Sequence, residues 1–208
     1  RSRGLGDVYK RQAFDMLKKV KQRLITEGKI SHFNEISDAV FSVVEEFELE
    51  ASKTAKIFDA TPKTLKALRD MKLKIGLCTI SGEKATNHFL KCFNLEEFFD
   101  ASVTRDSVSE IKPHPTHLEA ALDALDVTSE EAVLVGDSIK DIQCAVQLNV
   151  IAVGVTTGLA SSEALTGSGA NYIASSVTDI PILVEQLNSC LLYTSDAADE
   201  EDSVDLGG

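Results

Sequence analysis

A hydroxyl side chain and a glycine-containing turn follow an apolar run in the first half of the sequence. Thr79 stands directly after the run Leu73–Cys78, and Ser81 and Gly82 come next, before a helical pattern begins. Backbone N–H groups at the start of a helix can bind an anion, and a nearby hydroxyl adds a further donor. A threonine in this place is also a common helix cap, so Thr79 alone is weak evidence for a site.

A pair of carboxylates follows a second apolar run. Asp137 comes directly after the run Ala132–Gly136, and Asp141 lies four residues further on, in the first turn of a predicted helix. Two carboxylates this close can share one hard cation such as Mg²⁺. Aspartates also stabilise a helix N-terminus, by about 0.3–1 kcal/mol, so capping is the alternative role. The spacing Gly-Asp-Ser-x-x-Asp directly after an apolar strand favours the metal site.

A lysine lies between these two stretches. Lys112 belongs to the segment Ile111–Pro115, where each proline keeps the residue before it out of the helical conformation. On its own, a lysine is most often a surface residue. His114 and His117 have a spacing that could suit a metal ion, but no third ligand is near them in the sequence. We therefore assign them ordinary roles in the loop and the helix start.

The elements that would carry these groups change character along the chain. Residues 13–58 show helical spacing of apolar residues. A solvated helix face is the interpretation of the acidic run Glu45, Glu46, Glu48 and Glu50. After Thr61 and Pro62, where proline suits the first turn of a helix, short apolar strands alternate with helices. This alternation predicts an α/β fold with a parallel sheet covered by helices, preceded by a small helical domain.

The predicted sheet would bring the polar groups together. In an open parallel sheet, ligands bind outside the carboxyl ends of the strands. We therefore expect Thr79, Lys112 and Asp137 to converge on one pocket. Together with Asp141, they suit a phosphoryl group bound with Mg²⁺.

The composition excludes several classes of protein. The 208 residues are 43% hydrophobic, enough for a real core, and carry a formal net charge of -12 without a cluster of lysine or arginine. This charge argues against a nucleic-acid binder. No apolar run approaches the roughly 20 residues that a membrane-spanning helix needs, and the four cysteines show no CxxC pairing. We expect a cytoplasmic, soluble protein without nucleic-acid or membrane partners, and the sequence leaves its oligomeric state open.

Both ends of the chain differ from the middle. Residues 1–12 and 190–208 look like translated sequencing adapters, because Asp7–Gln12 can be encoded by DNA whose reverse complement, read one base out of phase, encodes Cys190–Thr194. We set both segments aside as non-native. The alternative is a basic N-terminal arm and a disordered acidic tail. On the first interpretation, the natural gene was cut before Ala13.

The three motifs resemble those of the haloacid dehalogenase (HAD) superfamily of hydrolases, in particular its phosphoglycolate phosphatase-like branch with a helical cap. LCTISG, which contains Thr79, resembles the family's second motif, IKPHP with Lys112 the third, and VGDSIKD the fourth. The resemblance covers residues 13–189. It implies a Rossmann-like core over residues 59–189 and a partial helical cap over residues 13–58.

The implied activity is Mg²⁺-dependent hydrolysis of a small, phosphoglycolate-like phosphate monoester through an aspartyl-phosphate. The partner would be a small phosphorylated metabolite, selected by the cap. By resemblance, the phosphoryl group would be bound by Thr79, Ser81, Gly82 and Lys112, of which Thr79 and Lys112 would be catalytic, and Mg²⁺ would be held by Asp137 and Asp141.

The sequence departs from the family in one large respect. The family's first motif, DxDxT on the central strand, supplies the aspartate nucleophile, yet no two aspartates of this chain are separated by a single residue. We therefore expect an inactive fragment whose strands ending at Thr79 and Asp137 lack their shared neighbour. The alternatives are a non-catalytic binding or regulatory protein on the same fold, or a HAD phosphomutase. Ile80, where the branch often has asparagine, puts the fine substrate contacts in doubt.

Overall fold

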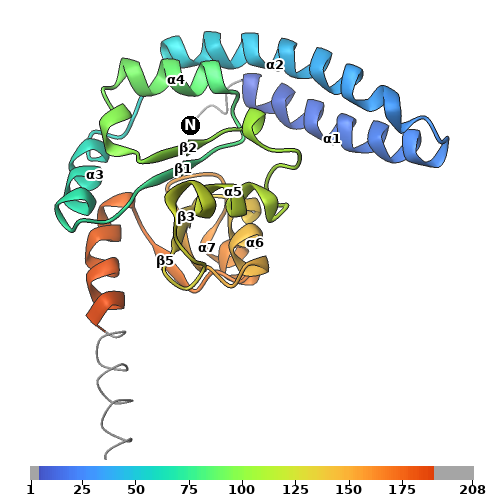
Figure 1. Cartoon of the computed structure of the whole chain (residues 1–208). Coiled ribbons are helices and arrows are strands. Elements are labelled where there is room, and N and C mark those ends of the chain that lie inside the picture. Colours follow the sequence, from blue (N-terminus) through green and yellow to red (C-terminus); the bar gives the residue numbers. More distant parts are fainter. Residues whose placement is uncertain (1–4, 190–208) are drawn as a thin grey trace, which may run out of the picture. The chain divides into compact units, whose positions relative to one another are not determined.

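The computed structural model describes residues 5–189, and their side chains from Ala13 onward. The chain forms two compact units (Figure 1). Of the described residues, the first unit contains 5–57 and 76–126, and the second contains 58–75 and 127–189. The predicted non-native tail, residues 190–208, lies outside the described residues. The chain thus first passes from one unit to the other at the end of the predicted cap segment.

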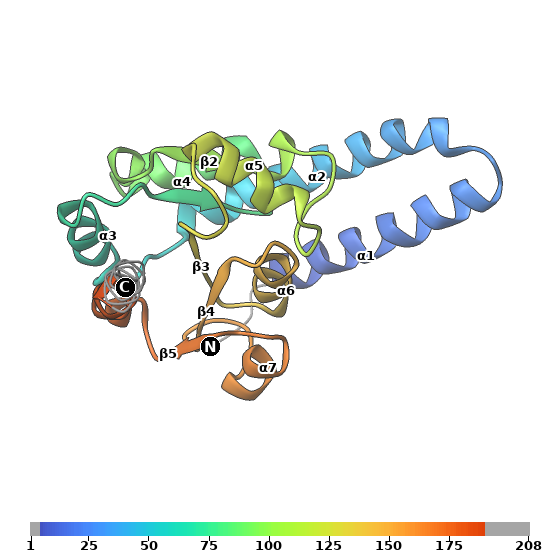
Figure 2. The ribbon, with the colours of Figure 1, turned by 60° about the horizontal axis from the view of Figure 1, so that its bottom comes forward.

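The first unit begins with a helical hairpin. Helix α1 (Leu5–Thr26) and helix α2 (Phe33–Thr54) run side by side, joined by a short 3₁₀ turn, η1 (Ile30–His32) (Figures 1 and 2). Residues 13–54 contain no strand, as the apolar spacing predicts. Helix α1 already starts at Leu5, so it includes part of the segment that the sequence analysis sets aside.

The first unit also contains two short parallel strands and the helices that follow them. Strand β1 (Gly76–Cys78) pairs with strand β2 (Ala101–Val103), in a register that places Cys78 opposite Val103. Helix α4 (Glu83–Cys92) follows β1, and helix α5 (Thr116–Leu125) follows the loop after β2. Figure 1 shows α4 lying along α2.

The apolar run Leu73–Cys78, which predicts a strand, is longer than the observed strand β1. Lys72 has a positive φ of 62°, and the N–H of Leu73 still donates to Leu68 in the helix before it, so the chain becomes extended only later. At the other end, β2 gives way to a 3₁₀ turn, η3 (Arg105–Ser107), which ends the ladder. The helix before β1 and the turn after β2 therefore set the two ends of this ladder. A single apolar run does not show either of them.

The second unit holds a three-stranded parallel sheet in the order β3-β4-β5. Its strands and helices alternate as predicted, and the helix at Thr61 has proline in its first turn. Its elements are α3 (Thr61–Asp70), β3 (Val133–Gly136), α6 (Ile139–Gln147), β4 (Ile151–Val155), α7 (Ser162–Gly167), β5 (Tyr172–Ala174), the 3₁₀ turn η4 (Val177–Asp179), and helical residues 180–189.

The core of the second unit forms around the central strand β4. Val153, Ile142 and Leu165 have no exposed surface, and Val155 is 3% exposed. Burying a side chain of this size contributes roughly 1.5–3 kcal/mol. The apolar strands and the amphipathic helices therefore pack as the α/β pattern requires, and the predicted fold class is confirmed.

The strands fall into two sheets. Within residues 5–189, β1 pairs only with β2, and β3 pairs only with β4. A strand shared by β1 and β3 would have contradicted the expectation that their common neighbour is missing. No helix among the described residues is long and apolar enough to cross a membrane.

Candidate active site

Thr79 begins the turn that joins β1 to α4. Its N–H donates to the oxygen of Val103 at 2.9 Å, which extends the pairing with β2 by one residue. Its Oγ1 accepts a hydrogen bond from the N–H of Ser81 at 3.2 Å. A hydroxyl that accepts a hydrogen bond still has its own proton to donate to another group. This is the use that the resemblance gives to Thr79.

The backbone N–H groups of the same turn have acceptors within the protein. The N–H of Ser81 points to Thr79, and the N–H of Gly82 donates to Oε2 of Glu48 on α2 at 2.9 Å. The next N–H, that of Glu83, donates to Oδ2 of Asp106 at 2.7 Å. A phosphoryl oxygen that used the Gly82 N–H would therefore have to replace a carboxylate, so the phosphate-binding role of Ser81 and Gly82 stays a prediction.

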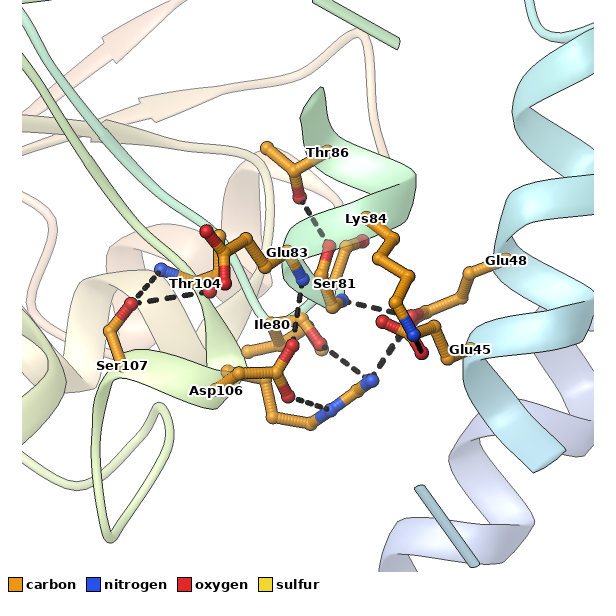
Figure 3. Close-up of polar contacts among 12 residues, drawn as sticks. Glu45, Glu48, Ile80, Ser81, Glu83, Lys84, Thr86, Thr104, Asp106 and Ser107 are labelled. Carbon is orange, nitrogen blue, oxygen red and sulfur yellow. Dashed lines mark hydrogen bonds and ion pairs between the residues drawn. The ribbon is translucent and has the colours of Figure 1, made fainter. Parts of the chain in front are cut away.

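Glu48 corrects the interpretation of the acidic residues on α2. Only 9% of its side chain is exposed, and it forms an ion pair with Arg105, whose side chain is 2% exposed (Figure 3). The expectation of a solvated helix face was wrong for this residue, because the face of α2 that carries Glu48 packs against α4. Glu45 lies on the same side and pairs with Lys84 of α4.

Lys112 is held against the strand that ends at Thr79. Its Nζ donates to the backbone oxygen of Cys78 at 2.7 Å, and the residue is 9% exposed. The alternative of an ordinary surface lysine is therefore wrong. A buried lysine needs acceptors or a negative charge for its ammonium group, and the Cys78 carbonyl supplies one acceptor. Lys112 and Thr79 are thus brought together within the first unit.

His117 accepts a hydrogen bond from the backbone of Lys112. The residue has no exposed surface; its Nδ1 accepts the N–H of Lys112 at 3.3 Å, and its Nε2 lies 3.4 Å from the oxygen of Val103. Since a carbonyl oxygen only accepts, this pattern places the ring proton on Nε2. Both ring nitrogens serve the framework, in agreement with the structural role that the sequence analysis prefers over metal binding.

Asp137 and Asp141 lie in the second unit, at the end of β3 and the start of α6. Asp141 is 8% exposed and forms a capping box with Ser138. Its Oδ2 accepts from the Ser138 hydroxyl at 2.6 Å and from the Ser138 N–H at 3.2 Å. The capping alternative is therefore real for Asp141, and one of its two oxygens is committed to it.

Two glycines make room for the two aspartates. A Cβ atom at Gly158 would lie 1.8 Å from Oδ2 of Asp137, and a Cβ at Gly136 would lie 2.3 Å from the Cβ of Asp141. Any side chain at position 158 would therefore displace the Asp137 carboxylate. The sequence does not reveal the part played by Gly158, because only the folded chain brings the loop after β4 against the end of β3.

The two carboxylates suit Mg²⁺ in their donor chemistry. Mg²⁺ prefers oxygen ligands, keeps several waters, and is often held by one or two carboxylates. Among the residues that the structure describes, no group of three or more histidine, cysteine, aspartate or glutamate side chains could hold a metal ion. Two carboxylates would be enough for an ion that completes its shell with water, and the binding of Mg²⁺ by Asp137 and Asp141 stays a prediction.

The motifs and the fold agree with the comparison to known proteins. Residues 8–155 match the family model of the haloacid dehalogenase-like hydrolases, and the chain belongs to this family. The match begins inside the segment 1–12. The pyrophosphatase PpaX of Bacillus mycoides is 30% identical over 131 residues, which are 63% of this chain and 61% of that protein. The chain thus spans less than two thirds of the length of this curated relative.

Solved structures of the family share the fold. The HAD phosphatase of Thermococcus onnurineus is 24% identical and superposes with a TM-score of 0.60, covering 83% of this chain and 87% of that chain. A predicted phosphoglycolate phosphatase from Haemophilus somnus is 20% identical with a TM-score of 0.59, covering 83% and 75%. At these identities the likeness establishes the architecture.

Proposed function

We propose that this chain carries the substrate-binding and metal-binding groups of a Mg²⁺-dependent phosphatase for small phosphorylated metabolites. The observation that carries the proposal is the position of Lys112, whose Nζ is bound to the carbonyl of Cys78, one residue before Thr79. A buried ammonium group and a threonine hydroxyl at the end of one strand form a donor pair for an anion. The names of the relatives, a pyrophosphatase and a phosphoglycolate phosphatase, support a small phosphorylated substrate.

Each side chain would have a separate task. The hydroxyl of Thr79 would donate to an oxygen of the phosphoryl group, and the ammonium of Lys112 would balance its negative charge. Asp137 and Asp141 would hold Mg²⁺, which when bound offsets the repulsion between an anionic nucleophile and the anionic substrate. The reaction would be the hydrolysis of a phosphate ester or anhydride through an aspartyl-phosphate, with the nucleophilic aspartate supplied by an Asp-x-Asp-x-Thr motif that this chain does not contain.

Residues 13–58 would belong to a cap that selects the leaving group, and residues 59–189 to the catalytic core, in a cytoplasmic enzyme. Substrates of the two relatives' classes differ in charge and in the bond that is cleaved. Profiling a phosphate monoester such as phosphoglycolate against pyrophosphate in an active form of the enzyme would choose between them. The same profile, run with a hexose phosphate, would reveal the mutase alternative as transfer instead of release of phosphate.

A second candidate is a binding protein that uses the same pocket without chemistry. The specific observation in its favour is that no two aspartates in the chain are separated by a single residue. Sequencing the genomic locus separates the two candidates. An in-frame Asp-x-Asp-x-Thr ahead of the helical segment supports the hydrolase, whereas a native start codon near Ala13 supports the binding protein and would overturn the hydrolase.

A further inference from the structure

The turn between β1 and α4 takes its hydrogen bonds from two other segments. The backbone oxygen of Ile80 lies 3.4 Å from Nη1 of Arg105, and that of Ser81 accepts the N–H of Arg105 at 3.1 Å. On the other side, the N–H of Gly82 donates to Glu48 at 2.9 Å. Two successive peptide groups of the turn are therefore fixed by one residue after β2 and one residue of α2 (Figure 3).

Arg105 and Glu48 also bind each other. Nη1 of Arg105 lies 3.2 Å and 3.1 Å from the two carboxylate oxygens of Glu48. The guanidinium carbon of Arg105 lies over the ring of Phe41, 4.8 Å from the ring centroid, and 5.9 Å from the centroid of the Phe14 ring. Removing one member of a buried ion pair leaves the other charge uncompensated, which is strongly unfavourable. The pair therefore resists separation of α2 from the turn.

The packing around the pair leaves no freedom at Gly82. A Cβ atom at this position would lie 2.7 Å from Nη2 of Arg105 and 3.3 Å from Oε2 of Glu48. The start of α4 therefore lies so close to the guanidinium group that only a glycine fits at position 82. The next residue is fixed in the same way, because Asp106 accepts the N–H of Glu83 and its Oδ1 lies 3.4 Å from Nε of Arg105.

We propose that Arg105 and Glu48 are positioning residues for the turn that carries Thr79. Arg105 sets the two carbonyl groups, Glu48 sets the Gly82 N–H, and the ion pair between them makes the position of helix α2 a determinant of the turn's shape. Movement of α2 away from α4 would remove the carboxylate from the Gly82 N–H and expose that donor to an anion. The anion that the turn would bind rests on the proposed function. The hydrogen bonds that hold the turn in place do not.

The test is amide hydrogen exchange of the 208-residue chain, followed by NMR, in three variants. E48Q keeps the shape and one acceptor but removes the charge, and R105M keeps a long side chain over Phe41 without the guanidinium. E45Q is the matched control, because Glu45 joins the same two helices through Lys84, which is 73% exposed. The amides of α5, in the same unit, provide the internal reference.

We expect E48Q and R105M to speed exchange of the Gly82 amide at least tenfold more than exchange of the α5 amides, and E45Q to leave the ratio unchanged. A ratio that stays constant in E48Q would mean that the pair stabilises the unit only globally, and would overturn the proposal. The same follows if E45Q has an equal effect. Should R105M fail to fold, E48Q alone decides the outcome.

A second arm keeps this inference separate from the proposed function. Inorganic phosphate is titrated into the wild-type chain while the amide signals of Thr79 and Ser81 are followed. If phosphate moves neither signal but E48Q loosens Gly82, the positioning role stands and the phosphate site fails. If phosphate moves both signals and E48Q leaves Gly82 unchanged relative to α5, the phosphate site stands and the positioning role is wrong.

Discussion

The side chain of Lys112 is bound to the backbone of Cys78: its Nζ donates to the Cys78 oxygen over 2.7 Å, across 34 positions of sequence. This contact places a buried ammonium group beside the turn that starts at Thr79. The backbone N–H of the same lysine donates to Nδ1 of His117. Hydrogen bonds therefore fix both the main chain and the side chain of Lys112. A group that binds a charged ligand has to be held in position in this way.

Replacing the lysine tests its part in anion binding. We expect K112M to weaken binding of inorganic phosphate at least tenfold, because the methionine fills the space but carries neither charge nor donor. The lost hydrogen bond to Cys78 should also lower the free energy of unfolding by about 1–3 kcal/mol. Calorimetric titration and urea unfolding measure the two effects. The control K91M changes an exposed lysine of α4 and should alter neither; equal phosphate affinity in both variants would remove Lys112 from the site.

Gly158 offers a test of the Asp137 carboxylate. In G158A the new Cβ would lie 1.8 Å from Oδ2 of Asp137, so the carboxylate must rotate away. We expect the affinity for Mg²⁺ to fall at least tenfold, measured by competition with a fluorescent chelator. The control G167A adds a methyl group at a helical glycine with nothing within 4 Å; it should keep Mg²⁺ binding and raise stability by up to about 1 kcal/mol. Unchanged Mg²⁺ affinity in G158A would count against Asp137 as a ligand.

Asp141 caps helix α6 and is proposed to bind Mg²⁺, and substitutions can separate the observed role from the proposed one. S138A removes the hydroxyl partner of the capping box, and should cost about 0.5–2 kcal/mol in thermal unfolding with Mg²⁺ affinity nearly retained. D141N keeps an acceptor for Ser138 but loses the negative charge, so it should weaken Mg²⁺ binding with a smaller loss of stability. If D141N binds Mg²⁺ like the wild type, Asp141 is only a cap and the metal site reduces to Asp137.

The chain as it stands should not turn over a phosphate ester. It contains no pair of aspartates with the spacing of the nucleophile motif, so we expect no Mg²⁺-dependent release of p-nitrophenol from p-nitrophenyl phosphate above the background. The measurement compares the purified chain with K112M prepared in the same way. Turnover that K112M abolishes would show that a nucleophile lies elsewhere in this sequence.

Much of the fold follows from local sequence patterns. The proline after Thr61 correctly marks the start of α3, and the apolar run before Asp137 correctly gives β3 and the helix after it. Such elements depend on periodicity and caps within a few residues, which the sequence displays directly. Strand β1 was too long in the prediction, because its ends are set by the ladder with β2.

The buried charges could not be predicted from the sequence. Glu48 and Arg105 lie 57 positions apart and become buried only because α2 packs on α4. A helical pattern distinguishes apolar from polar faces, but it does not show that a carboxylate on the polar face will meet an arginine. One signal was available: Arg105 stands two residues after β2, in the position relative to its strand where ligand-binding groups are sought.

The proposed function requires that Thr79 and Lys112 bind a phosphoryl group, and NMR titration of the 208-residue chain tests this most directly. Inorganic phosphate is added while the amide signals of Thr79 and Lys112 are followed. We predict that the two signals shift together and give one dissociation constant. A shift at only one of the two residues, or no shift at all, would contradict the proposed phosphate site.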